Sequence, residues 1–306
     1  MLINGNALNI PLADESVHCV VTSPPYWGLR DYGTAEWIGG DAECDHNPQR
    51  PDGGQRADRT LPLGRGGMYR DTCRKCGAGR VDNQLGLEPT IEQYIANMVA
   101  VFREVWRVLR SDDSCWLNLG DSYAGSQQTG GLNSISGHNK SQPHANHKRN
   151  TPNLKPKDLC GIPWRLALAL QADGWWLRSD IIWHKPNPMP ESVTDRPTKS
   201  HEYVFLLTKS ARYFYDADAV RERYVEPDKN ARPTPIMGMR TGGHGSLGKP
   251  RTEFYKHGGR NRRTVWTIPT RPYSGSHFAT FPPDLVEPCI KAGTSERGCC
   301  PECGKP

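Results

Sequence analysis

The apolar positions of this 306-residue chain follow two periodic patterns. Short apolar runs predict buried strands, and apolar residues at three- and four-residue spacing predict helices. Strands are expected at 17–22, 115–119, 175–183 and 201–208, and helices at 91–109, 162–172 and 282–291. Residues 1–24 are expected to form a strand, a turn and the strand 17–22. Because strands and helices alternate along the chain, the pattern favours an α/β fold with some parallel pairing.

Long polar segments separate these elements and indicate the domain organisation. Residues 38–86 are rich in Gly, Arg and Asp and lack sustained periodicity, which is typical of an insertion. Residues 122–157 contain no acidic residue but five Lys or Arg and three His, as expected of a basic loop. We expect a catalytic core at 1–37 and 87–220 that carries this loop, followed by segments at 221–271, 272–298 and 299–306.

Composition narrows the class of protein. The chain has 39 Lys and Arg against 33 Asp and Glu, a formal net charge of +6. It contains no stretch of the roughly 20 apolar residues that a membrane span needs, and its first residues lack the regions of a signal peptide. We therefore expect a cytoplasmic protein without a membrane partner, whose ten cysteines are more typical of metal binding than of disulfides.

The sharpest chemical signal is Ser23-Pro24-Pro25-Tyr26, the Ser-Pro-Pro-Tyr motif, which directly follows the strand 17–22. The two prolines remove ladder donors and end the strand. Functional groups of α/β sheets lie at such carboxyl ends. Ser23 Oγ and the Pro24 carbonyl are two rigidly held hydrogen-bond acceptors, and Tyr26 adds an aromatic ring beside them.

This motif resembles the hallmark of the DNA amino-methyltransferases that act on cytosine N4 or adenine N6. With such a substrate, Ser23 Oγ and the Pro24 carbonyl would accept from the exocyclic amine and localise its lone pair toward an incoming methyl group. Tyr26 would stack on the base once it has left the duplex. The segments RVLRSDD, WLNLGDSYAG, RSDIIWHKPNPMPESVTDR, SHEYVFLLTKS and HFATFPPDLVEPCIKAGT follow in the order typical of the branch with this motif near its N-terminus. The resemblance implies a Rossmann-like sheet, double-stranded DNA as substrate and a bacterial or phage source, with a restriction endonuclease as an associated partner. Ser23 at the first motif position favours cytosine N4 slightly over adenine N6. An RNA or protein amide methyltransferase is the alternative.

The resemblance also implies S-adenosylmethionine as methyl donor. The stretch His277, Phe278, Ala279, Thr280 and Phe281, within the segment 272–298, matches the part that lies beside the cofactor in this branch. Asn6 stands where relatives usually carry an Asp. The glycine-rich cofactor loop that follows this stretch in the branch does not occur within the 306 residues. We therefore expect a shortened chain or a loop from another polypeptide, with a DNA-binding remnant that does not bind cofactor as the alternative.

Four potential ligands in the insertion 38–86 predict a structural zinc site. They are Cys44, His46, Cys73 and Cys76. A Cys-x2-Cys knuckle followed by glycine suits tetrahedral zinc, and free thiols in a loose loop are the alternative. Cys300-x2-Cys303 resembles half of a second site.

The basic segments 122–157 and 221–271 are candidates for duplex contacts. Residues 221–271 carry twelve Lys or Arg against four Asp or Glu. Lys and Arg neutralise phosphates, and Arg can read bases. In the branch that the chain resembles, the target-recognition region lies at this place, between SHEYVFLLTKS and HFATFPPD. A solvated charged loop is the alternative interpretation.

Overall fold

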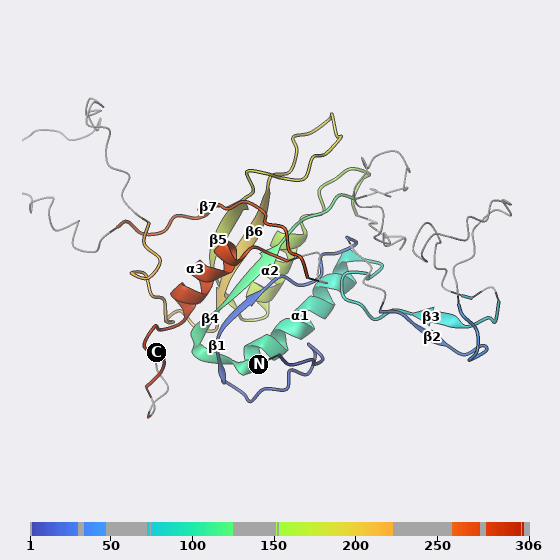
Figure 1. Cartoon of the computed structure of the whole chain (residues 1–306), viewed down its shortest axis with the longest axis horizontal. Coiled ribbons are helices and arrows are strands. Elements are labelled where there is room, and N and C mark those ends of the chain that lie inside the picture. Colours follow the sequence, from blue (N-terminus) through green and yellow to red (C-terminus); the bar gives the residue numbers. More distant parts are fainter. Residues whose placement is uncertain are drawn as a thin grey trace, which may run out of the picture.

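The structure is a computed structural model that describes most of the chain. The described residues are 2–29, 34–46, 72–73, 75–124, 151, 153–222, 259–275, 280–300 and 302. A central five-stranded sheet has the strand order β1-β4-β6-β5-β7 (Figure 1). Its strands are β1 (Val17–Thr22), β4 (Leu109–Leu119), β5 (Trp176–His184), β6 (His201–Thr208) and β7 (Val265–Thr267). The α/β prediction is confirmed.

The antiparallel direction of β6 determines which strand ends lie together at each edge of the sheet. β1 pairs with β4, and β5 with β7, in parallel, whereas β6 is antiparallel to both β4 and β5. The carboxyl ends of β1, β4 and β5 therefore lie at the same edge as the amino end of β6. The register shows this directly, because Leu119 pairs with Tyr203 and His184 with His201.

Helices cover both faces of the sheet (Figure 1). On one face, α1 (Ile91–Val108) and α2 (Ile162–Ala172) pack onto a core that includes Phe102, Leu166, Leu117 and Phe205. On the other face, α3 (Pro283–Gly293) packs onto a second core around Trp116. Side chains of β4 and β6 point alternately into one core and the other, because successive residues of a strand face opposite sides of the sheet. Among the helices of the described ranges, none has the length and apolar character needed to span a membrane.

The sequence predicts α1 well. Thr90 is its N-cap, and its side chain accepts a hydrogen bond from the Gln93 amide at 3.2 Å. The periodic apolar residues face the core, where Tyr94, Met98 and Phe102 are fully buried. The helix gains its stability from this apolar face as well as from the cap.

Two expectations about strands need correction. No strand precedes β1 within residues 2–12. The side chain of Asn6 instead accepts from the Leu8 amide at 2.9 Å and the Asn6 carbonyl from the Asn9 amide at 2.9 Å, which makes a turn. β4 begins six residues before the expected Cys115, and its pairing with β1 shifts register between Val17 and Cys19. The polar residues 110–113 fall in this irregular part, and so the hydrophobic pattern misses it.

A two-stranded hairpin lies outside the central sheet. β2 (Glu36–Ile38) pairs antiparallel with β3 (Gly79–Val81), and Figure 1 shows the hairpin beyond the first turn of α1. It brings together the two ends of the insertion that the sequence predicts at 38–86.

Candidate active site at one edge of the sheet

The Ser-Pro-Pro-Tyr motif directly follows β1, at the edge of the sheet where the carboxyl ends of β1, β4 and β5 meet the amino end of β6. Neighbouring residues hold the motif in place through hydrogen bonds. Tyr94 of α1 donates to the Pro25 carbonyl at 2.9 Å. The buried Trp27 indole donates to the Glu88 carbonyl at 2.8 Å, and the Gly28 amide donates to the Gly86 carbonyl. Hydrogen bonds from α1 and from the segment before it therefore fix the loop that carries the motif.

The hydroxyl of Tyr26 is the centre of a polar network. It accepts from Ser23 Oγ at 3.2 Å and lies 2.7 Å from Glu202 Oε2 and 3.0 Å from Asn118 Oδ1. Burial, and then the charge of Glu202, raises the pKa of Tyr26 well above its ordinary value. Tyr26 is therefore protonated and donates to these acceptors. Its ring edge lies against Gly120, where a Cβ would come within 2.7 Å of Cε2.

Three residues that the sequence did not single out complete the network. Asn118 Nδ2 donates to Glu202 Oε2 at 3.1 Å and to the Tyr203 carbonyl at 3.0 Å. Lys185 forms an ion pair with Glu202, and its ammonium lies 4.1 Å from the Trp183 ring centroid. The only sequence signal for Lys185 and Glu202 is their position at the ends of two predicted strands.

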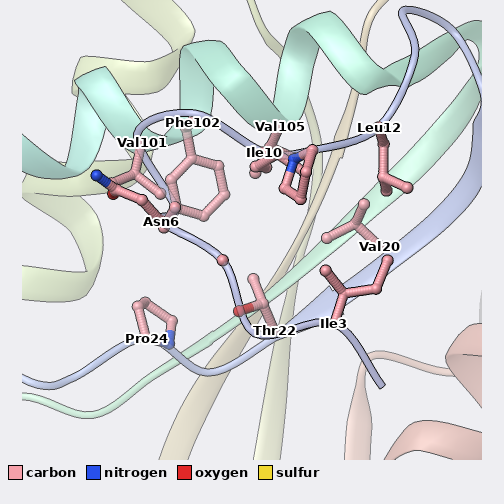
Figure 2. Close-up of a pocket in the computed structure, with 13 residues that line it drawn as sticks. Ile3, Asn6, Ile10, Leu12, Val20, Thr22, Pro24, Val101, Phe102 and Val105 are labelled. Atoms are coloured by element: carbon pink, nitrogen blue, oxygen red, sulfur yellow. The ribbon is translucent and has the colours of Figure 1, made fainter. Parts of the chain in front are cut away.

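A cavity of about 280 Å³ opens beside the motif, between the N-terminal segment, β1 and α1. Its walls are mainly apolar, and Figure 2 shows Asn6, Thr22 and Pro24 around it with Phe102 of α1. Asn6 Oδ1 accepts from the Leu8 amide, so its Nδ2 is the group that could donate to a ligand. Asn6, which the sequence predicts to contact the cofactor, and Pro24 of the motif thus line the same cavity.

Of the other predicted cofactor residues, the two that the structure describes, Thr280 and Phe281, do not line this cavity. His277, Phe278 and Ala279 lie outside the described residues. Thr280 is exposed, and Phe281 packs against the core around Trp116, on the face of the sheet opposite α1. Asn6 therefore lies beside the motif on the α1 side of the sheet, whereas Phe281 packs on the opposite face.

The four predicted metal ligands come together at the hairpin. One ligand atom from each of Cys44, His46, Cys73 and Cys76 lies within 4.8 Å of every other. The Cys44 and Cys73 sulfurs are 3.9 Å apart, and Cys76 Sγ lies 3.6 Å from His46 Nδ1. A tetrahedral zinc with ordinary bond lengths separates two sulfurs by about 3.8 Å and a sulfur from a nitrogen by about 3.6 Å.

Backbone geometry supports the same arrangement. Gly40 has φ +72°, and a Cβ there would lie 2.8 Å from Cys76 Sγ. Gly77, directly after the knuckle, has φ +79°, and its amide donates to the Cys73 carbonyl at 2.9 Å. The His46 ring stacks on Trp37 with centroids 4.7 Å apart. Glycines and a stacked ring thus fold the chain tightly around the four side chains.

Comparison with known proteins identifies the family. The profile of the N6_N4_Mtase family, described as DNA methylase, matches residues 17–300. The chain belongs to this family of DNA methylases. The resemblance stated from the sequence is confirmed, and with it the expected enzyme class.

Curated relatives agree with this assignment. The chain is 40% identical over 295 residues to the type II methyltransferase M.Cfr9I of Citrobacter freundii, a match that covers 96% of this chain and 72% of that protein. It is 41% identical over 298 residues to M.XycI of Xanthomonas campestris pv. cyanopsidis, with the same two coverages. Among solved structures, it is similar to the cytosine-N4-specific PvuII DNA methyltransferase (12% identity, TM-score 0.48, covering 95% of this chain and 69% of that chain). It is also similar to TTHA0409, a putative DNA modification methylase from Thermus thermophilus complexed with S-adenosyl-L-methionine (17% identity, TM-score 0.42, covering 94% and 71%).

The basic segments of this methylase are only partly described. Residues 125–150 and 223–258 lie outside the described residues. These ranges make up most of the two segments, 122–157 and 221–271, that are candidates for duplex contacts. At the flanks of the second segment, Arg260 and Arg263 each contact Glu222 at 3.0 Å, and Arg221 contacts Asp218 at 2.6 Å. These three arginines are therefore paired with carboxylates of the chain itself.

Proposed function

We propose that this DNA methylase transfers a methyl group from S-adenosylmethionine to an exocyclic amino group of a base extruded from double-stranded DNA. The carrying observation is the position of Ser23 and Pro24, at the end of β1, beside the Tyr26 network and the apolar cavity. Two fixed acceptors are what a weakly nucleophilic amine needs, and preorganised polar groups of this kind contribute strongly to catalysis. Because serine stands at the first motif position, cytosine N4 is slightly favoured over adenine N6.

The roles of the motif follow from its geometry. Ser23 Oγ and the Pro24 carbonyl accept the two N–H groups of the amine and hold its lone pair toward the donor. The Tyr26 ring would supply the stacking face for the base, while its hydroxyl is held by Glu202 and Asn118. Stacking of a base on an aromatic ring contributes about 1–3 kcal/mol.

The cavity beside the motif suits the adenine end of the cofactor. Apolar walls that include Ile10, Phe102 and Val105 fit a flat heteroaromatic ring, and Asn6 can donate to one of its ring nitrogens. When bound, S-adenosylmethionine supplies an electrophilic methyl group on a sulfonium. The resemblance also assigns the segment 277–281 to the cofactor, and of that segment the structure describes Thr280 and Phe281.

The test is a methyl-transfer assay with tritiated cofactor and duplex DNA, followed by digestion to nucleosides. Label in N4-methylcytosine is the expected result, and label in N6-methyladenine would overturn the base preference alone. Equal labelling of RNA or a peptide in competition would contradict the DNA assignment. Calorimetric titration with S-adenosylmethionine separates the enzyme from a DNA-binding remnant, since only the enzyme gives saturable binding. A neighbouring restriction endonuclease is the partner that fits a type II modification enzyme.

We also propose that the four-ligand cluster at the hairpin binds one structural zinc ion. The separations of the sulfur and nitrogen atoms match tetrahedral coordination. A metal would stabilise an insertion whose two described strands have only three residues each. Elemental analysis of protein purified without chelators should find about one zinc per chain, and its absence would defeat the assignment.

A further inference from the structure

The polar residues behind Tyr26 restrict which atoms can donate and which can accept. A carboxylate only accepts hydrogen bonds, and an ammonium only donates them. Lys185 donates to Glu202 Oε1, while Glu202 Oε2 faces Tyr26 at 2.7 Å and Asn118 Nδ2 at 3.1 Å. Glu202 therefore presents one oxygen to the lysine and the other to the network.

Asn118 adds a second acceptor with a fixed orientation. Its Nδ2 donates to the Tyr203 carbonyl at 3.0 Å and to Glu202, both of which only accept. Its Oδ1 must then face Tyr26, at 3.0 Å. Both groups on this side of the tyrosine hydroxyl are acceptors, so the single Tyr26 proton is directed toward them.

The direction of the Tyr26 proton determines whether the Ser23 hydroxyl can accept a hydrogen bond from a ligand. Because Tyr26 uses its proton toward Glu202 and Asn118, it can only accept from Ser23, which lies at 3.2 Å. The Ser23 proton therefore faces Tyr26, and the Ser23 lone pairs remain for a ligand. An exocyclic amine, which approaches with N–H donors, needs a lone pair of this kind.

We propose that Glu202 is a positioning residue that sets the direction of the Ser23–Tyr26 hydrogen-bond chain, so that Ser23 meets the amine as an acceptor. Lys185 holds Oε1 of Glu202, so that Oε2 faces Tyr26. The inference rests on the role given to Ser23 under the proposed function. It adds a residue 176 positions from Tyr26 along the chain to the methyl-transfer site.

A glutamine at position 202 separates this role from simple packing. Its carbonyl would be drawn to the Lys185 ammonium, which turns its NH₂ group toward Tyr26 and Asn118 Nδ2. Tyr26 then accepts from the glutamine, and only Asn118 Oδ1, at 3.0 Å, still draws the tyrosine proton away from Ser23. Where that proton turns to Ser23 instead, the Ser23 proton is directed at the substrate. In the double variant with Lys185→Met, nothing holds the glutamine carbonyl away, so it can turn back to Tyr26 and restore the original direction.

The experiment compares single-turnover methyl-transfer rates at saturating duplex DNA and S-adenosylmethionine. We expect Glu202→Gln to slow the reaction about tenfold or more, with cofactor affinity and melting temperature close to those of the unaltered protein. Glu202→Gln with Lys185→Met should recover a substantial part of the rate. Glu287→Gln, on the exposed side of α3, is the matched control and should leave the rate unchanged.

The results of these variants separate the positioning role of Glu202 from the proposed function of the motif. An unaltered rate in Glu202→Gln would overturn the inference. So would a loss that Lys185→Met deepens while cofactor affinity falls with it, since that is the behaviour of a purely structural ion pair. Ser23→Ala is measured alongside, and full activity in that variant would overturn the proposed function of the motif itself. An inactive Ser23→Ala with an unaltered Glu202→Gln would overturn the positioning role alone.

Discussion

Replacing Gly120 with alanine tests how Tyr26 is held in the site. A Cβ at position 120 would lie 2.7 Å from Cε2 and 3.1 Å from Cδ2 of Tyr26. An ordinary contact begins at 3.4 Å, so the ring or the end of β4 must move by about 0.7 Å, from 2.7 to 3.4 Å. The ring cannot move by this amount without disturbing the bond from its hydroxyl to Glu202.

The structure gives the size of the expected effect. A misplacement of about 1 Å near the chemistry can cost on the order of 100-fold in rate. We therefore expect Gly120→Ala to slow methyl transfer by roughly tenfold to 100-fold. Overpacking costs about 1–3 kcal/mol of folding free energy, a loss that a thermal melt detects.

Single-turnover rates with tritiated cofactor and duplex DNA measure this effect. Gly79→Ala is the matched control, because the nearest atom to its Cβ is the Ile38 carbonyl oxygen at 3.9 Å, an ordinary contact. In a Tyr26→Ala background, where the clash is gone, Gly120→Ala should add no further loss. An unaltered rate in Gly120→Ala alone, or an equal added loss in both backgrounds, would refute the idea that Gly120 acts through the tyrosine ring.

Three further predictions concern the metal, a buried carboxyl and a helix cap. Cys76→Ser should lose the bound zinc and lower the melting temperature, whereas the exposed Cys299→Ser should keep the metal, and equal zinc contents would contradict the site. Burial raises the pKa of Asp113 to about 7, so the folded state retains a proton that the unfolded state releases, and stability should fall as the pH rises from about 4 to about 7. Asp113→Asn should accordingly gain stability relative to the unaltered protein as the pH rises from about 4 to about 7, and a pH-independent difference in chemical denaturation would count against this. Thr90→Ala should cost about 1 kcal/mol in the same measurement because it removes the cap of α1, and an unaltered midpoint would show that the cap contributes nothing.

Local pattern was enough to predict the elements that position the motif. The apolar run of β1 ends at two prolines, and the spacing of apolar residues in α1 matches its buried face. The four residues of the Cys and His cluster were also singled out from the sequence, because residue type and the glycine after the knuckle are local signals. The pairing of Glu36 with Val81, which brings the two halves of that cluster together, is visible only in the structure.

The network around Tyr26 could not be predicted from the sequence because it depends on long-range pairing. Asn118 and Glu202 are 84 positions apart, and they meet only because β6 runs antiparallel between β4 and β5. A hydrophobic pattern predicts that residues 201–208 form a strand, but neither its direction nor its neighbours. Asn6 and Phe281 were both assigned to the cofactor from the resemblance, and only the structure shows that Asn6 lines the cavity while Phe281 packs on the opposite face of the sheet.

The most direct test of the account is the identity of the methylated atom and its dependence on Ser23. Duplex DNA is incubated with tritiated S-adenosylmethionine and either the unaltered protein or Ser23→Ala, digested to nucleosides and separated by chromatography. The account predicts label on an exocyclic nitrogen, in N4-methylcytosine, and its loss in Ser23→Ala even though that variant still binds the cofactor. Label on a ring carbon, or undiminished label in Ser23→Ala, would contradict it.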